Sequence, residues 1–336
     1  MTIYDIAKEA GVSASTVSRV INGKPGIKEA TRRRVQKLLD ENEYIPNAAA
    51  RGLVKQASRF IGILIEDIRV SHHTESAYVI EQEMTRCGYT CITFSTGADP
   101  EQKVKYVEIL EQRQVEGVIM IGSMFGTKQV EDTISRHLSK IPVVLVNGEL
   151  NLPNVFSILV DEERGTTDCV LSLAEKGYKK LLYMMDVSTP SNEHKLEGFR
   201  TGLMKLGIRD ADARVVYAPG SGTSPDDSIQ RGYEITSVLL RENYEADAIL
   251  CATDLLAIGC MRQLQEQRID VPGQIAVMGV DNTLYGQLTT PTLSTLDNKL
   301  SELSMNAARV LLDALEDRAV SHKIMIFPEI IERRST

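Results

Sequence analysis

From residue 60 onward, short apolar runs alternate with segments of helical periodicity, and this alternation strongly limits the possible folds. The first series of runs covers residues 60–67, 89–96, 117–122, 142–147 and 156–161. A second series covers residues 180–186, 213–219, 248–253 and 275–281. Segments between the runs, such as 76–88 and 103–114, carry helical spacing. Because strands that alternate with helices form parallel sheets covered on both faces, the two series predict an α/β body with two lobes.

Three carboxylates directly follow apolar runs and are candidate ligand contacts. Ligands of open α/β sheets bind at the carboxyl ends of the strands. Asp161, Asp254 and Asp281 occupy such positions, and a carboxylate there can accept hydrogen bonds from sugar hydroxyls. Each could instead cap the helix that follows it. We favour capping for Asp254.

The first sixty residues have the pattern of three short helices. Thr2 can cap a helix that starts at Ile3, and Gly11 can end it. Ser13 can cap a second helix with Val17, Val20 and Ile21 spaced for a core, and a third helix is expected over about 28–42. Two short helices joined by a glycine-containing turn, with a third that closes the core, form a helix-turn-helix.

The second of these helices leaves small and polar side chains outside its apolar stripe, namely Ala14, Ser15, Thr16, Ser18 and Arg19. Small side chains allow a close approach to the major groove, hydroxyls can bond to bases or phosphates, and arginine can form a bidentate pair with guanine. The alternative is a three-helix bundle with a serine-rich surface.

The segment that follows, YIPNAAARGLVKQ, predicts a short helix. Pro46 breaks the third helix, and Asn47 can cap an alanine-rich helix that exposes Leu53. On DNA, Leu53 could act as an apolar wedge in the minor groove. The alternative is an ordinary linker.

Charge is distributed unevenly along the chain. The whole chain has a net charge of −8, yet residues 1–58 carry 10 Lys and Arg against 6 Asp and Glu, whereas the remainder carries 28 against 40. Because residues 1–58 are basic and the remainder is acidic, we expect only residues 1–58 to bind a polyanion. The sequence has no apolar run long enough for a membrane span and no signal-peptide pattern, so we expect a cytoplasmic protein without a membrane partner.

Two stretches, TIYDIAKEAGVSASTVSRVINGKPGIKEATRRRV and YIPNAAARGL, together resemble the LacI/GalR family of bacterial transcription regulators. The resemblance implies a helix-turn-helix DNA-binding domain over 1–46, a hinge helix and linker over 47–58, and a periplasmic-binding-protein-like domain for effector binding and dimerisation over 59–336. It implies an N-lobe of about 59–161 plus 292–321 and a C-lobe of about 162–291 plus 322–336, with crossings near 162, 291 and 321.

The resemblance also assigns DNA contacts. It implies base contacts by Ala14, Ser15 and Arg19. The residues implied to contact phosphates are Thr2, Tyr4, Ser13, Thr16 and Asn22. The hinge residues implied to contact the minor groove are Asn47, Ala50 and Leu53.

For the effector, the resemblance implies contacts by Asp281 and by Lys195, which stands where the family carries an arginine. Lysine lacks the planar fork of arginine. In the first loop, DIRVSHH, His72 and His73 replace aromatic residues, and Arg69 adds a cation; imidazole can stack and titrate. The expected effector-binding set is Arg69, His72, His73, Asp161, Lys195, Asp254 and Asp281. Its cations and histidines favour an anionic sugar.

We therefore expect a homodimeric repressor that binds a pseudo-palindromic double-stranded DNA operator and responds to a sugar or anionic sugar derivative. Two alternatives stay open: control by a phosphorylated carrier protein, and a sugar-binding protein that does not regulate DNA. No nucleophile, base or metal-ligand pattern indicates an enzyme, and residues 220–227 lack the GK[ST] of a phosphate loop. We expect no cofactor and no metal.

Overall fold

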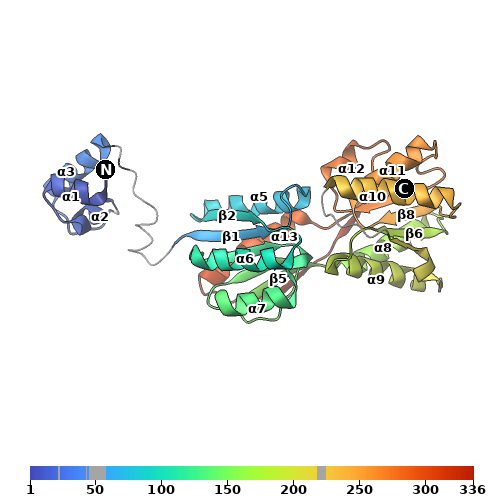
Figure 1. Ribbon diagram of the computed structural model, residues 1–336, viewed down its shortest axis with the longest axis horizontal. Coiled ribbons are helices and arrows are strands. Elements are labelled where there is room, and N and C mark those ends of the chain that lie inside the picture. The colour runs from blue at the N-terminus through green and yellow to red at the C-terminus, as the bar shows by residue number, and fades with distance from the viewer. Residues whose placement is uncertain (22, 43, 45–57, 218–224) are drawn as a thin grey trace. The chain divides into compact units, whose positions relative to one another are not determined.

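The structure, a computed structural model, describes residues 1–21, 23–42, 44, 58–217 and 225–336 (Figure 1). The chain divides into two compact units, Met1–Ser58 and Arg59–Thr336. The expected hinge over 47–58 lies almost entirely outside the described residues.

The first unit is a three-helix head with helices α1 (Ile3–Ala10), α2 (Ala14–Ile21) and α3 (Glu29–Glu41). Thr2 caps α1 in a capping box with Asp5, and Gly11, at φ 63°, ends the helix in the left-handed conformation that glycine tolerates. The three helices enclose a small apolar core of Ile6, Ala7, Ala10, Val17, Val20, Val35 and Leu39. The expected helical head is therefore confirmed.

The first sheet of the second unit is fully parallel, with strand order β11-β5-β4-β3-β1-β2. Its strands are β1 (Phe60–Ile65), β2 (Thr90–Ser95), β3 (Gly117–Ile121), β4 (Val143–Val146), β5 (Val155–Val160) and β11 (Lys323–Ile326). Helices α5 (Ser71–Arg86) and α13 (Leu300–Leu315) pack on one face, and α6 (Pro100–Gln112) and α7 (Lys128–His137) pack on the other. A short helix, η1 (Ser123–Phe125), follows β3.

The second sheet has the order β12-β10-β9-β8-β6-β7, parallel except for β12. Its strands are β6 (Leu181–Met185), β7 (Val215–Tyr217), β8 (Ala248–Cys251), β9 (Ala276–Val280), β10 (Ser294–Asp297) and β12 (Glu329–Ile331). Helices α8 (Glu162–Glu175) and α9 (Pro190–Lys205) cover one face, and α10 (Pro225–Arg241) and α11 (Asp254–Glu266) cover the other. The short helices are η2 (Ala211–Arg214) and α12 (Leu284–Leu288).

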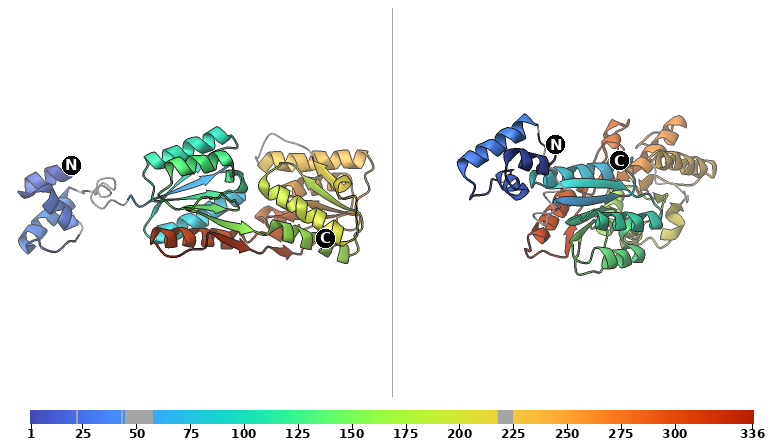
Figure 2. Two further views of the ribbon diagram at one scale, coloured as in Figure 1. Left: turned by 90° about the horizontal axis from the view of Figure 1, so that it is seen from below. Right: turned by 60° about the vertical axis from the view of Figure 1, so that its left-hand side comes forward.

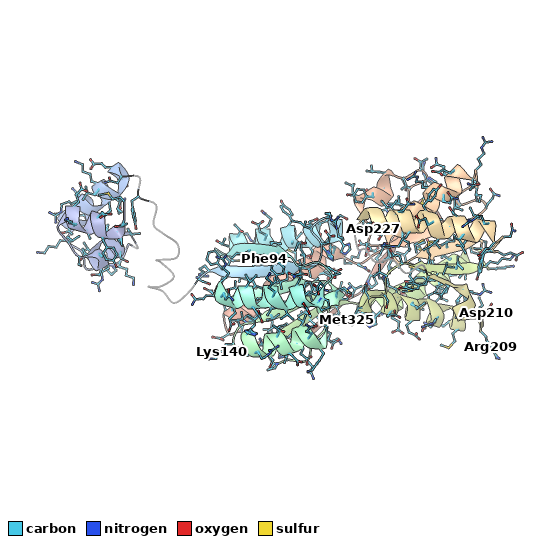
Figure 3. The ribbon with its side chains drawn as sticks, in the orientation of Figure 1. Phe94, Lys140, Arg209, Asp210, Asp227 and Met325 are labelled. Carbon is cyan, nitrogen blue, oxygen red and sulfur yellow. The ribbon has the colours of Figure 1, made fainter. Side chains whose placement is uncertain are left out.

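The two sheets form two lobes of one unit, as Figure 2 shows for the segments from Arg59 onward. In Figure 3, Met325 lies where the lobes meet, whereas Lys140 and Arg209 lie toward opposite ends of this unit. The expected two-lobed α/β body with parallel sheets is confirmed.

The chain passes between the lobes after β5, after β10 and after β11. The predicted first residues of two lobe segments, 292–321 in the N-lobe and 322–336 in the C-lobe, are wrong. Strand β10 lies in the second sheet, so the crossing near 291 comes later, and β11 lies in the first sheet, so the crossing near 321 also comes later. Both strands have only four residues, and β11 is partly exposed, so neither shows the apolar run that marks a long buried strand.

Within the described ranges, no helix combines the length and the apolar character that crossing a membrane requires.

Candidate functional site

Helix α2 has a polar, exposed side and an apolar side that packs in the head core. Val17 and Val20 are buried in the head core, whereas Ser13, Ser15 and Arg19 are exposed. Ser13 caps the helix because its Oγ accepts the backbone N–H of Thr16 at 3.3 Å. The same hydroxyl lies 2.8 Å from Ser15 Oγ and 2.9 Å from Thr16 Oγ1. The amino end of α2 therefore gathers three hydroxyls, and Arg19 extends from its last turn.

The other residues expected at DNA have differing surroundings. Tyr4 is 74% exposed, and Ala14 is half-buried against the head core. The Thr2 hydroxyl donates to Asp5 Oδ2 at 2.7 Å and accepts the Asp5 N–H at 3.3 Å, so it also serves the capping of α1. Four residues of the expected set lie outside the described residues: Asn22, Asn47, Ala50 and Leu53.

A cavity of about 200 Å³ lies in the second unit at the carboxyl ends of strands from both sheets. Of the expected effector residues it brings together His72, His73, Lys195 and Asp281. Polar residues that follow strands also line it, namely Glu66 after β1, Asn147 after β4, Glu162 after β5, Asp186 after β6 and Asn298 after β10. The placement agrees with the general position of ligand sites in open α/β sheets.

Three expected effector residues are not among the cavity lining. Arg69 forms a pair with Asp67, with Nε 3.0 Å from Oδ1 and Nη2 2.6 Å from Oδ2. Asp161 caps α8 by accepting the Arg164 N–H at 3.1 Å, and it lines a neighbouring hollow instead.

Asp254, the third expected effector residue outside the cavity lining, is buried and accepts hydrogen bonds within the second lobe. Its Oδ2 accepts from the Thr283 N–H at 2.7 Å and the Thr283 hydroxyl at 3.0 Å, and its Oδ1 accepts from the Thr295 hydroxyl at 2.6 Å. Our favoured interpretation of Asp254 as a cap is wrong, because Thr253 caps α11 by accepting the Leu256 N–H.

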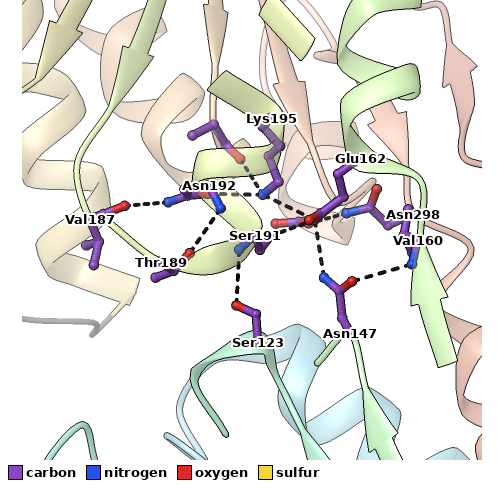
Figure 4. A network of polar contacts seen from close by, with 12 residues as sticks. Ser123, Asn147, Val160, Glu162, Val187, Thr189, Ser191, Asn192, Lys195 and Asn298 are labelled. Carbon is purple, nitrogen blue, oxygen red and sulfur yellow. Dashed lines mark hydrogen bonds and ion pairs between the residues drawn. The ribbon is translucent and has the colours of Figure 1, made fainter. Parts of the chain in front are cut away.

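Lys195 lies in a closed network of polar contacts (Figure 4). Its Nζ donates to Asn192 Oδ1 at 3.2 Å and to the Ala252 carbonyl at 3.1 Å, and it lies 3.7 Å from Glu162 Oε1. The side chain is 4% exposed. Because these three acceptors surround the ammonium group, it is neutralised and largely saturated by the protein itself.

Glu162 joins the two lobes within this network. Its Oε1 accepts from Ser191 Oγ at 2.6 Å and from Asn147 Nδ2 at 3.3 Å, while the Ser191 N–H donates to Ser123 Oγ at 3.3 Å. Burial raises the pKa of Glu162, against the opposing effect of Lys195. Sequence reasoning missed Glu162, although it stands next to Asp161 at the end of an expected strand.

His72 and His73 are uncharged at neutral pH. Burial lowers the pKa of His72 to about 4, with Lys195 adding to the effect, and lowers that of His73 to about 3. His73 Nδ1 lies 3.2 Å from the Asp67 carbonyl, which can only accept, so Nδ1 carries the proton and Nε2 is an acceptor. Because Arg69 is paired with Asp67 and the imidazoles are neutral, these three residues do not support the expected attraction of an anion.

Asp281 and Asn282 hold left-handed backbone conformations, with φ of 104° and 50°. Such conformations cost about 1–3 kcal/mol in a non-glycine residue and cluster at functional sites. Asn298 Nδ2 donates to Asp281 Oδ1 at 3.1 Å, and burial raises the pKa of Asp281. Over the described residues, no group of three or more His, Cys, Asp and Glu side chains could hold a metal ion.

Comparison with known proteins gives family matches in both units. Residues 2–47 match the family described as "Bacterial regulatory proteins, lacI family", and residues 170–336 match the periplasmic binding protein-like domain. The chain is 29% identical to an HTH-type transcriptional regulator of Lachnoclostridium phytofermentans and to catabolite control protein A of Priestia megaterium. Each match covers 100% of this chain and 99% of the relative.

Solved structures share the fold along the whole chain. A LacI-family transcriptional regulator from Silicibacter pomeroyi has a TM-score of 0.83 at 25% identity, with 100% of this chain and 99% of that chain covered. The lac repressor dimer bound to operator and an anti-inducer has a TM-score of 0.87 at 23% identity, with 100% and 98% covered. With a helix-turn-helix head, a two-lobed body and regulators as full-length relatives, this chain belongs to the LacI family of DNA-binding bacterial transcription regulators.

Proposed function

We propose that the protein is a dimeric repressor that binds a pseudo-palindromic operator and is controlled by a small effector in the cavity of the second unit. The observation that carries this proposal is the exposed face of α2. Ser15 and Arg19 are exposed there, while Val17 and Val20 of the same helix are buried in the head core. Arg19 and Ser15 contact bases in the major groove, and Ser13, Thr16 and Tyr4 contact phosphates. Two heads of a dimer read half-sites about one helical turn apart.

The cavity supports control by a ligand because its wall joins both lobes through Glu162, Asn147, Ser191 and Ser123. A ligand that changes these contacts changes the lobe arrangement. It regulates DNA binding only if its affinity differs between the DNA-competent and the DNA-incompetent state.

Selection of bound sequences from a random DNA pool, at about physiological salt, tests the proposal. We expect a palindromic consensus. Recovery of no consensus, both with the protein alone and with candidate effectors present, would contradict direct operator binding. Addition of effector to the selected complex should then release the DNA if the protein is an induced repressor.

The variant Arg19→Ala tests how the operator is read. Loss of a bidentate arginine–guanine contact should weaken operator binding by about 1–3 kcal/mol and relax the preference at one base pair of each half-site. Nonspecific DNA, bound through phosphates with a steep salt dependence, should lose much less affinity. The matched control is Arg33→Ala on α3, where Arg33 pairs with Glu29 at 3.2 Å on an exposed surface. Unchanged base preference in Arg19→Ala would remove Arg19 from the reading surface.

A further inference from the structure

The charge on the cavity wall carries an inference about the effector's chemistry, which rests on the proposed function of this cavity. Of the described lining residues, four are carboxylates and one is a lysine. Glu66 is paired with Lys103 at 3.3 Å, and Asp186 is paired with Arg231 at 2.8 Å. Glu162 and Asp281 are left to share the single charge of Lys195, and burial raises the pKa of both carboxyl groups because this one cation does not compensate for the lost solvent.

Lys195 has little capacity left for a ligand. Its three nearest acceptors are Asn192 Oδ1, the Ala252 carbonyl and Glu162 Oε1, all of them protein atoms. An anionic ligand would have to displace one of these contacts and would also approach two carboxylates. The cavity therefore opposes an anion, although it contains a lysine.

Two buried oxygens of lining residues also lack a hydrogen-bond donor. Glu162 is 2% exposed and Asn298 is 8% exposed, and neither Glu162 Oε2 nor Asn298 Oδ1 accepts a hydrogen bond from a described residue. Asn298 is oriented by its bond to Asp281, because its Nδ2 must face a carboxylate that only accepts. His73 adds a further acceptor, since its Nδ1 proton is directed to the Asp67 carbonyl and its Nε2 is therefore unprotonated.

A cation that carries several hydrogen-bond donors would balance the negative charge and would also bond to the unpaired acceptors. An ammonium group supplies one positive charge and three donors, and hydroxyls supply further donors. Electrostatic attraction is stronger here than in bulk water because the side chains of Glu162 and Lys195 are almost fully buried. The cavity volume of about 200 Å³ limits the ligand to a small molecule.

We propose that the effector is a small hydroxylated amine, for example an amino sugar, whose ammonium group binds between Asp281 and Glu162. Its hydroxyls donate to the remaining acceptors of the wall, including His73 Nε2. A neutral sugar leaves the excess negative charge unbalanced, and a sugar acid or sugar phosphate increases it.

Calorimetric titration of the full-length protein, without DNA, tests this inference on matched compounds. The probes are glucosamine, glucose and glucuronate, with galactosamine, galactose and galacturonate as a second set and mannosamine, mannose and mannuronate as a third. We expect an amino member of one set to bind at least tenfold more tightly than its neutral and acidic counterparts. A neutral or acidic member that binds as tightly, or the absence of binding by every amino member, overturns the inference.

Two variants locate the ammonium group. Asp281→Asn and Glu162→Gln each remove one negative charge and should each lower the affinity for the amine at least tenfold. The matched control is Asp161→Asn, since Asp161 neighbours Glu162 in sequence but is not among the cavity lining. Thermal unfolding of each variant shows whether it is folded. Amine affinity that is unchanged in both folded cavity variants overturns the assignment.

These outcomes are separate from those of the proposed function. The DNA selection tests operator binding, both with the protein alone and with candidate effectors present, and the titration tests the ligand class without DNA. A protein that selects an operator but binds glucose as tightly as glucosamine keeps the proposed function and loses this inference.

Discussion

At the scale of single residues, Asp254 is deeply buried and accepts three hydrogen bonds. Burial disfavours the carboxylate, and it raises the pKa of Asp254 to about 7 although Thr283 and Thr295 both oppose that shift. A carboxyl group with a raised pKa in the folded state binds a proton over a pH range in which the unfolded chain has already lost it. The free energy of unfolding therefore falls as pH rises between about 4 and about 7.

The variant Asp254→Asn should remove this pH dependence. The difference in unfolding free energy, wild type minus variant, should fall by an amount on the order of a few kcal/mol as pH rises from about 4 to about 7. Denaturant unfolding at several pH values measures it. Asp227→Asn, which removes a charge from an exposed side chain, serves as the control. A difference that rises with pH, or stays constant, would contradict the assignment.

The sequence predicted well which strand ends contribute residues to the cavity. It predicted less well which side chains at those ends face the cavity. His73 and Asp281 line the cavity, whereas Arg69 is paired with Asp67. Glu162 lines the cavity and its neighbour Asp161 does not. Successive residues at a strand end point in different directions, and the choice depends on packing with other elements. The neutral state of His73 also depends on burial, which one sequence does not reveal.

At the scale of elements, α10 and α11 pack with their backbones in close contact. A Cβ atom at Gly259 would collide with the Ile229 carbonyl oxygen, and one at Gly232 would collide with the Leu256 carbonyl oxygen. Both helices therefore need glycine where they cross, although glycine lowers helix propensity.

The variant Gly259→Ala tests this packing. Alanine would gain up to about 1 kcal/mol from helix propensity. The collision with backbone that cannot easily move should cost more, for a net loss of about 1–3 kcal/mol. Denaturant unfolding of the full chain measures the change, with the exposed Gln265→Ala on the same helix as control, which should stay within about 0.5 kcal/mol of wild type. Stabilisation by Gly259→Ala would show that the helices can separate at little cost.

Most elements could be predicted because their apolar patterns are long and regular. The strands of the first sheet from β1 to β5 coincide with apolar runs, and α2 follows from Ser13, Val17 and Val20. Strand β10 and the crossings near it could not be predicted. Its four residues are held by β9 and β12, which are neighbours in the sheet and not in the sequence.

At the scale of the whole molecule, the proposed regulation links the two units, Met1–Ser58 and Arg59–Thr336. Whatever the path between them, a coupling of binding free energies is reciprocal. If the effector weakens operator binding by a given factor, the operator must weaken effector binding by the same factor.

This reciprocity provides a test that needs no knowledge of the mechanism. We expect the effector's dissociation constant, titrated with and without saturating operator, to differ by the factor that saturating effector imposes on operator affinity. A coupling of about 1–3 kcal/mol would correspond to a factor of roughly 5–150. DNA of equal length without the palindrome is the control and should leave effector affinity unchanged at the same salt concentration. Equal effector affinity in all three conditions would mean that ligand binding in the cavity does not regulate the head, because no differential affinity would remain to shift the equilibrium.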